Sequence, residues 1–243
     1  MATITLCRPQ RRNAQTPHTW TALREFGRGL TGEVRVVVVR GEGPSFSAGL
    51  DRSMFSGESL PGIASFTEMA RMPDAEAVAL IASYQEAFSW LSRPDIVSVA
   101  AVQGHAVGAG FQLALACDLR IAADDAQFTM AETSLGLVPD LGGTRILVEL
   151  VGYPRALEIC VTGRRVDAAE AARLGLVELV VAPADLAAAT SDLTAAVLAA
   201  PRDAVVETKA LLAAARHRDP AGQLRAEREA QLRRIRDLAG VGE

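Results

Sequence analysis

Residues 95–140 read DIVSVAAVQGHAVGAGFQLALACDLRIAADDAQFTMAETSLGLVPD, and this stretch decides the fold. No charged residue occurs from position 96 to position 117, although 22% of the chain is charged. A membrane span needs roughly 20 predominantly apolar residues, and the window has that length. However, glycines interrupt it at 104, 108 and 110, and Gln103, His105 and Gln112 carry polar groups that lipid would not satisfy. The stretch therefore predicts a strand at 97–102, a glycine turn at 104–110 and a buried helix at 111–117.

In this stretch, the groups most suited to bind a ligand are main-chain groups and not side chains. Glycine lets a backbone approach a ligand closely, and a helix start presents N–H groups that have no partner inside the helix. A second loop of this kind, GEGPSFSAGLD at residues 41–51, follows an apolar strand. Loops that follow the strands of an α/β sheet commonly carry ligand sites. Each loop is therefore a candidate ligand site.

Hydrophobic patterning predicts an α/β core followed by a helical region. With 243 residues, 49% of them hydrophobic, the chain can bury a large core in one domain or in a domain with a helical appendage. The predicted strands lie at 3–6, 34–39, 97–102, 119–122, 126–130 and 177–181. The predicted helices lie at 19–30, 74–91, 111–117, 146–151, 154–161, 168–174, 186–200, 203–216 and 223–238. We predict a core at residues 1–185 and a C-terminal helical region at 186–243, whose last helix has a thin apolar stripe that suits a partner subunit or the parent domain.

Charge and cysteine content argue against several classes of protein. The formal net charge is -4, which gives no support for a nucleic-acid or anionic-membrane surface. The cysteines at 7, 117 and 160 are scattered without C-x-x-C spacing, so neither a disulfide framework nor a zinc site is expected. The first residues lack a charged segment followed by an apolar one, so no secretory signal is expected and the predicted location is cytoplasmic.

A nucleotide-binding alternative fits the glycine pattern at 104–110 only superficially. The turn of a short-chain dehydrogenase follows the first strand, whereas this one lies about a hundred residues into the chain. That chemistry also needs a Tyr-x-x-x-Lys pair. Lys209 is the only lysine, and neither Tyr84 nor Tyr153 precedes it at that spacing. We therefore reject this alternative.

In combination, four motifs resemble the crotonase (enoyl-CoA hydratase/isomerase) superfamily over nearly the whole chain. They are C-R-P to R-N-A at 7–14, G-x-G-x-x-F-x-A-G-x-D at 41–51, A-V-x-G-x-A-x-G-x-G-x-x-L-A-L-A-C-D at 101–118 and F-x-x-x-E-x-x-L-G-x-x-P-x-x-G-G at 128–143. The resemblance implies a spiral core of ββα turns with a C-terminal helical region, assembled as homotrimers that are usually paired into hexamers.

The same resemblance implies an acyl-CoA substrate whose thioester oxygen is held by two backbone N–H groups. By position these belong to Ala48 and Ala109. Fixed donors aimed at the oxygen of a forming enolate can be worth about 3–4 kcal/mol each. Residues expected to contact the substrate or its CoA part are Ala48, Gly49, Leu50, Asp51, Gln112 and Lys209. No metal and no cofactor besides the CoA of the substrate is implied.

The carboxylates decide which reaction the resemblance implies. Hydratases of the family use two glutamates twenty residues apart; Glu132 matches the second, but Gln112 stands in place of the first. A glutamine is neutral and can only hydrogen-bond, so the hydration machinery is incomplete. Isomerases of the family manage with the equivalent of Glu132. Asp140 is a second candidate, because dienoyl-CoA isomerases of the family carry a working aspartate there, although aspartate is also a good turn former.

The predicted function is proton transfer on an enoyl-CoA, with double-bond isomerisation preferred and hydration through Glu132 left open. Loss of one glutamate would also suit a protein that binds acyl-CoA without turning it over, as a carrier or regulator. His105, a lone histidine in the uncharged window, is expected to be structural.

Overall fold

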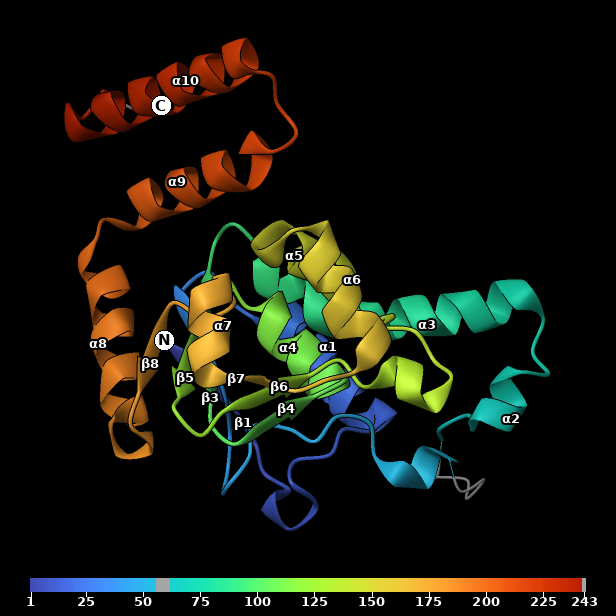
Figure 1. The fold of residues 1–243 in the computed structure, drawn as a ribbon. Coiled ribbons are helices and arrows are strands. Elements are labelled where there is room, and N and C mark those ends of the chain that lie inside the picture. The colour runs from blue at the N-terminus through green and yellow to red at the C-terminus, as the bar shows by residue number, and fades with distance from the viewer. Residues whose placement is uncertain (56–61, 242–243) are drawn as a thin grey trace.

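The computed structural model describes residues 1–55 and 62–241, and its centre is a parallel sheet with helices on both faces (Figure 1). The strand order is β1-β2-β3-β5-β8. The strands are β1 (Ala2–Leu6), β2 (Val36–Gly41), β3 (Val97–Val102), β5 (Leu119–Ala123) and β8 (Leu179–Val181). A smaller sheet contains β4 (His105–Val107), β6 (Gln127–Thr129) and β7 (Val166–Asp167), in which β4 and β6 are parallel and β6 and β7 antiparallel. The predicted α/β fold with a C-terminal helical region is confirmed.

Helices and short 3-10 turns lie between the strands along the chain. Up to residue 174 they are α1 (Pro17–Gly29), α2 (Phe66–Met69), α3 (Asp74–Ser89), α4 (Ala109–Ala116), α5 (Gly143–Val151), α6 (Tyr153–Thr162) and α7 (Ala168–Leu174). Short 3-10 turns lie at η1 (Pro9–Arg11), η2 (Arg52–Phe55), η3 (Trp90–Ser92), η4 (Glu132–Leu135) and η5 (Pro183–Asp185). Within residues 1–55 and 62–241, no helix is long and apolar enough to cross a membrane.

Strand β3 explains why the central stretch is almost free of charge. Successive side chains of a strand point to opposite faces. Val97, Val99 and Ala101 join a cluster with helix α8 (Leu186–Ala199), while Ala100 and Val102 join the main core on the other face. A strand of a parallel sheet that is buried on both faces is apolar at nearly every position. Ser98, the polar exception, is satisfied by Leu91 O and by the carboxylate of Asp118.

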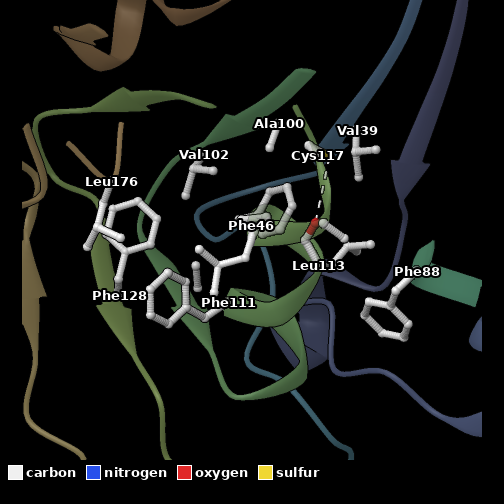
Figure 2. Close-up of a cluster of buried hydrophobic side chains, with 14 of the residues drawn as sticks. Val39, Phe46, Phe88, Ala100, Val102, Phe111, Leu113, Cys117, Phe128 and Leu176 are labelled. Atoms are coloured by element: carbon white, nitrogen blue, oxygen red, sulfur yellow. Dashed lines mark hydrogen bonds between the residues drawn. The ribbon is translucent and has the colours of Figure 1, made fainter. Parts of the chain in front are cut away.

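The main core lies between the sheet and the layer of helices that contains α1, α3 and α4. Phe46, Phe111 and Phe128 meet Leu113 and Leu176 there (Figure 2). The rings of Phe111 and Phe128 are tilted with centroids 5.3 Å apart. Each ring buries a large apolar area. This cluster therefore stabilises the packing of α4, the helix that follows the glycine turn, against the sheet.

Two local predictions in this region were wrong. The segment predicted as a turn at 104–110 contains strand β4, which pairs with β6, and the helix begins at Ala109 instead of Phe111. Strand β7 was not predicted at all. The glycines and prolines of residues 53–74 predict an irregular segment. The structure places part of η2 and all of α2 in it, and its residues 56–61 lie outside the described residues.

The C-terminal helices differ in how they meet the core. Helix α8 covers the second face of the sheet, whereas α9 (Arg202–Ala215) and α10 (Pro220–Leu238) form a pair that extends away from the sheet (Figure 1). Lys209 ties α9 to the core, since its ammonium donates to Arg93 O, Ile96 O and Asp118 Oδ2 at 2.7, 2.7 and 2.6 Å. The division at residue 186 stays a prediction.

Candidate active site

An apolar cavity of about 360 Å³ lies between α3, α4 and the segment that follows η4. It is lined by residues of the two predicted ligand loops and by residues of α1, α3 and η4. Its lining residues are Pro17, Trp20, Ala48, Gly49, Leu50, Met54, Phe55, Phe66, Met69, Ile81, Tyr84, Val107, Gly108, Ala109, Gln112, Ala131, Glu132, Leu135, Leu137, Val138, Asp140 and Leu141. Of the predicted site residues, this cavity brings together Ala48, Gly49, Leu50, Ala109, Gln112, Glu132 and Asp140.

Glu132 is the buried carboxylate of the cavity, with 9% of its surface exposed. Its Oε1 accepts a hydrogen bond from Gln112 Nε2 at 2.7 Å, and its Oε2 has no partner among the described residues. Burial raises the pKa of Glu132 and is the largest cause. The main chain of Glu132 and Ala131 and the hydrogen bond from Gln112 lower this pKa, whereas the charge of Asp140 raises it. One carboxylate oxygen is therefore held, and the other is a free, partly desolvated proton acceptor.

Gly108 leaves the space beside this carboxylate open. Its φ of 51° lies in a region that L side chains rarely adopt. A Cβ at this position would lie 3.3 Å from Glu132 Oε1. The turn thus brings the start of α4 against the carboxylate without placing a side chain there.

Gln112 has both ends of its amide engaged. Its Oε1 accepts from the N–H groups of Leu141 and Gly143 at 2.9 and 3.2 Å, and these two donors fix the amide so that Nε2 faces Glu132. Gln112 was predicted to contact the substrate. The structure places it in the cavity wall, 1% exposed, where it acts on Glu132 and on the segment before α5.

Asp140 lies at the edge of the cavity and remains exposed. Desolvation by the surrounding residues raises the pKa of its carboxyl group. Its main-chain oxygen accepts from Gln85 Nε2 at 2.7 Å. The two predicted catalytic carboxylates thus share one cavity, and the charge of Asp140 raises the pKa of Glu132.

The predicted role of the Ala48 N–H group was wrong. This group donates to Arg12 O at 2.8 Å and is therefore not available to a ligand. Gln15 forms a parallel bridge with Leu50, in which Gln15 N–H donates to Gly49 O and Asp51 N–H donates to Gln15 O. Because successive N–H groups of an extended segment point in opposite directions, the Leu50 N–H points away from Gln15.

Leu50 and Ala109 each carry an N–H group at the cavity wall that lacks an acceptor among the described residues. Neither N–H is hydrogen-bonded within residues 1–55 and 62–241, and Ala109 opens α4, where the first N–H groups have no partner inside the helix. The two segments touch, since a Cβ on Gly49 would lie 2.4 Å from Val107 O and 3.5 Å from Ala109 N. Gly49, with a φ of 82°, permits this approach.

Two residues predicted to contact the substrate have other roles in the structure. Asp51 binds Arg8 Nη2 at 2.9 Å and Ser53; burial alone would raise its pKa, but these hydrogen bonds outweigh burial and hold the pKa below its ordinary value. Lys209 does not line the cavity, and its hydrogen bonds to Arg93 O, Ile96 O and Asp118 keep it in the α9 contact. The predicted contact of Lys209 with CoA, which could also involve the nucleotide of a neighbouring subunit, stays a prediction.

Some residues of the site were not predicted. Trp20 and Tyr84 form part of the cavity wall with ring centroids 4.9 Å apart, and Gln85 holds the segment at Asp140. Trp20 lies on the apolar stripe of the predicted helix at 19–30, a pattern that predicts core packing and no ligand contact. Nothing in the pattern of α3 distinguishes Tyr84 or Gln85. His105, predicted as structural, contacts Ser45 Oγ through Nδ1 at 3.3 Å. No group of three His, Cys, Asp or Glu side chains with metal-ligand geometry occurs within the described ranges.

The fold and the glycine-turn cavity define the crotonase class of α/β proteins. The sequence model of the enoyl-CoA hydratase/isomerase family matches residues 1–237, and the chain belongs to this family. Among curated relatives, the protein YngF of Bacillus subtilis, provisionally named an enoyl-CoA hydratase/isomerase, is 36% identical over 82% of this chain and 72% of its own.

Solved structures agree with the family assignment. A protein of Thermobifida fusca YX, provisionally named an enoyl-CoA hydratase and crystallised with CoA, is 54% identical, with a TM-score of 0.92 over 98% of this chain and 90% of that one. A second structure under the same provisional name, with acetoacetyl-CoA, is 55% identical, with a TM-score of 0.93 over 97% of this chain and 91% of that one.

Proposed function

We propose that the chain is an enzyme that binds an enoyl-CoA thioester in this cavity and moves a proton along its acyl chain. The provisionally named Thermobifida fusca hydratase holds CoA in one structure and acetoacetyl-CoA in another, which supports an acyl-CoA ligand for its relative here. The apolar lining suits an acyl chain. Ala48, Gly49 and Leu50 line the cavity, and we propose that their main chain contacts the thioester and the adjoining part of CoA.

Glu132 is the proposed base. The single observation that carries the proposal is that Glu132 Oε1 is held by Gln112 while Oε2 is buried and has no partner in the described ranges. A carboxylate in an apolar cavity has a raised pKa, which makes it a better proton acceptor and a competent acid in the reverse direction. Oε2 is the oxygen that we assign to proton transfer.

The enolate is proposed to be stabilised by the N–H groups of Leu50 and Ala109. Removal of a proton next to a thioester places negative charge on the carbonyl oxygen. Two preorganised N–H donors in a cavity with little water can lower the barrier by several kcal/mol. Because the donors are main-chain groups, an alanine at position 109 serves as well as a glycine would.

Double-bond isomerisation is the preferred reaction. Starting from a 3-enoyl-CoA, Oε2 of Glu132 takes a proton from C2, and the electron pair passes into a dienolate whose charge lies on the thioester oxygen. The same carboxyl group then protonates C4, which leaves the double bond between C2 and C3 and the composition unchanged. No metal, redox cofactor or water is consumed.

Hydration is disfavoured because Gln112 replaces a second carboxylate. Two carboxylates can orient and deprotonate a water, whereas the amide of Gln112 donates directly to Glu132 at 2.7 Å. No water fits between two groups at hydrogen-bond distance. Asp140, the other carboxylate among the described residues that line the cavity, is proposed to tune Glu132 through its charge, and its own part in proton transfer is tested below.

We also propose that copies of the chain assemble through the C-terminal region as homotrimers or hexamers. The helix pair α9–α10 exposes large apolar side chains, namely Leu212, Leu224, Leu232, Ile235 and Leu238. Light scattering should give a mass of three or six chains. A Leu232→Glu, Ile235→Glu double variant should lower that mass, and a monomeric wild type would contradict the proposal.

The function is tested by incubating purified protein with a 2-enoyl-CoA and, separately, a 3-enoyl-CoA, and identifying products by mass and retention. We expect conversion of the 3-enoyl-CoA at constant mass, a loss of about 100-fold or more in Glu132→Gln, and a smaller loss in Asp140→Asn. Gain of one water from the 2-enoyl-CoA, dependent on Glu132, would indicate a one-glutamate hydratase. Binding of both substrates without conversion would favour a non-enzymatic acyl-CoA carrier or regulator.

A further inference from the structure

The peptide unit between Asp140 and Leu141 is held at both ends by glutamine side chains. Its carbonyl oxygen, Asp140 O, accepts from Gln85 Nε2 at 2.7 Å, and its N–H, on Leu141, donates to Gln112 Oε1 at 2.9 Å. Gln85 belongs to α3 and Gln112 to α4. A single peptide group therefore links two helices on opposite sides of the cavity edge.

This link continues to the carboxylate. Gln112 Nε2 donates to Glu132 Oε1 at 2.7 Å, so the hydrogen bonds run in one direction from Gln85 through the peptide and Gln112 to Glu132. Each amide in such a series is polarised by its neighbour in the same sense. This effect is strongest in the buried part of the series, from Leu141 through Gln112 to Glu132, whereas the bond from Gln85 is exposed. The series ends on a negative charge, where a polarised donor is most effective.

The direction of the series depends on the position of the segment before α5. Gln112 presents Nε2 to Glu132 because the N–H groups of Leu141 and Gly143 occupy its oxygen. If that segment shifts, the amide of Gln112 loses the donors that fix its orientation, and Glu132 can lose its hydrogen bond. Gln85 is the side chain that holds the segment from the other side.

We propose that Gln85 is a positioning residue for Glu132, acting through the Asp140–Leu141 peptide and Gln112. It does not touch the carboxylate. Its effect is to keep one oxygen of Glu132 occupied, so that the other receives the proton. This inference rests on the proposed role of Glu132 as the base.

Two other titratable groups, Asp140 and Cys160, interact with Glu132 through charge. Asp140, from the segment before α5, raises the pKa of Glu132 through its charge. Cys160, on α6, has its own pKa raised by burial and by the charge of Glu132. Loss of the Gln112 donor removes an interaction that lowers the pKa of Glu132, so the pKa of Glu132 should rise when Gln85 is replaced.

The variants are Gln85→Leu, which removes the amide, and Gln85→Glu, which keeps the length but offers no N–H to a carbonyl oxygen. Glu86→Gln, one position along α3 and paired with Arg28 on the surface, is the matched control. In the isomerase assay we expect kcat to fall about three- to tenfold in both Gln85 variants, with KM and melting temperature little changed. The acid limb of the pH profile of kcat should move to higher pH, and the control should match wild type. If the acid limb in the Gln85 variants lies at the same pH as in wild type, the proposal is overturned.

A readout that does not need turnover separates this inference from the proposed reaction. With 15N-labelled glutamine, the side-chain signal of Gln112, assigned by its loss in Gln112→Leu, should titrate with Glu132 in the wild type and not in Glu132→Gln. The midpoint should rise in both Gln85 variants and stay unchanged in Glu86→Gln. An equal midpoint in wild type and Gln85→Leu would show that Gln85 does not position Glu132, whether or not the protein is an isomerase.

Discussion

The amide nitrogen of Gln112 lies 2.7 Å from Glu132 Oε1, although twenty positions separate the two residues in the chain. Helix α4 and turn η4 bring them together beside Gly108, and the N–H groups of Leu141 and Gly143 fix which end of the amide faces the carboxylate. The amide of Gln112 is therefore a neutral donor at a position where a second carboxylate would repel the carboxylate of Glu132. This contact leaves Glu132 as the buried carboxylate of the cavity and favours proton transfer over addition of water.

Replacement of Gln112 by glutamate should shift the reaction toward hydration. A carboxylate at position 112 would still accept from Leu141 and Gly143, but it would face Glu132 at close range, and two such groups cannot both ionise easily. We expect isomerase activity at neutral pH to fall about tenfold or more, and water addition to a 2-enoyl-CoA to increase relative to wild type. Product masses from both substrates measure this. Unchanged isomerisation with no added water would contradict the account.

Replacement of Glu132 by glutamine should make the protein more stable at neutral pH. The native pKa of Glu132 is raised, chiefly by burial. The folded state therefore holds the proton more tightly than the unfolded state, and stability falls as pH rises through the interval from the unfolded pKa to the native pKa. Glu132→Gln should raise the free energy of unfolding by about 1–3 kcal/mol at pH 7.

Thermal unfolding of wild type and Glu132→Gln across pH checks this prediction. The difference should vanish below the unfolded pKa, where the wild-type carboxyl group is protonated in both states. Equal stabilities at pH 7, or a difference that grows in acid, would show that burial does not raise the pKa of this residue.

Replacement of Ala109 by proline should remove one proposed enolate donor without breaking α4. Proline is tolerated at the first position of a helix, where its missing N–H has no partner inside the helix. Ala109 is that position. We expect kcat to fall about 10²–10³-fold, with helix content and melting temperature close to those of Ala109→Gly. Activity within a few fold of Ala109→Gly would exclude the Ala109 N–H as a donor.

Replacement of Lys209 by methionine should affect stability and not ligand binding. Its ammonium donates to Arg93 O and Ile96 O and pairs with Asp118, and the side chain is 14% exposed. Breaking a largely buried ion pair from one side typically costs about 3–5 kcal/mol. Denaturant unfolding should show a loss of this order, while calorimetry should give an unchanged CoA affinity. Weaker CoA binding at unchanged stability would instead support the predicted contact between Lys209 and the nucleotide part of CoA.

Local patterns sufficed to predict most of the fold. Strand β3 and helices α3 and α8 each have an uninterrupted run of hydrophobic residues that ends at a proline or where the hydrophobic spacing changes. Their bounds were therefore predicted to within one or two residues. Strand β4 was not, because three residues between two glycines read as a turn. What makes them a strand is pairing with 127–129, a contact between distant parts of the chain.

The site was predicted as a set of residues but not as a set of contacts. Glu132 and Asp140 do lie in one cavity, together with the backbone of the two loops. Which N–H is free could not be predicted, because it depends on Gln15 bridging Leu50 and on Arg12 O accepting from Ala48. The role of Gln85 depends on a hydrogen bond across fifty-five positions, for which α3 carries no local signal.

The most direct test of the central claim uses a 3-enoyl-CoA that carries deuterium on C2, followed in ordinary water with wild type and Glu132→Gln. We expect a product of unchanged heavy-atom composition, slower turnover than with the undeuterated substrate, and almost no product from Glu132→Gln. A product that has gained a water, or equal rates for wild type and Glu132→Gln, would contradict proton transfer by Glu132.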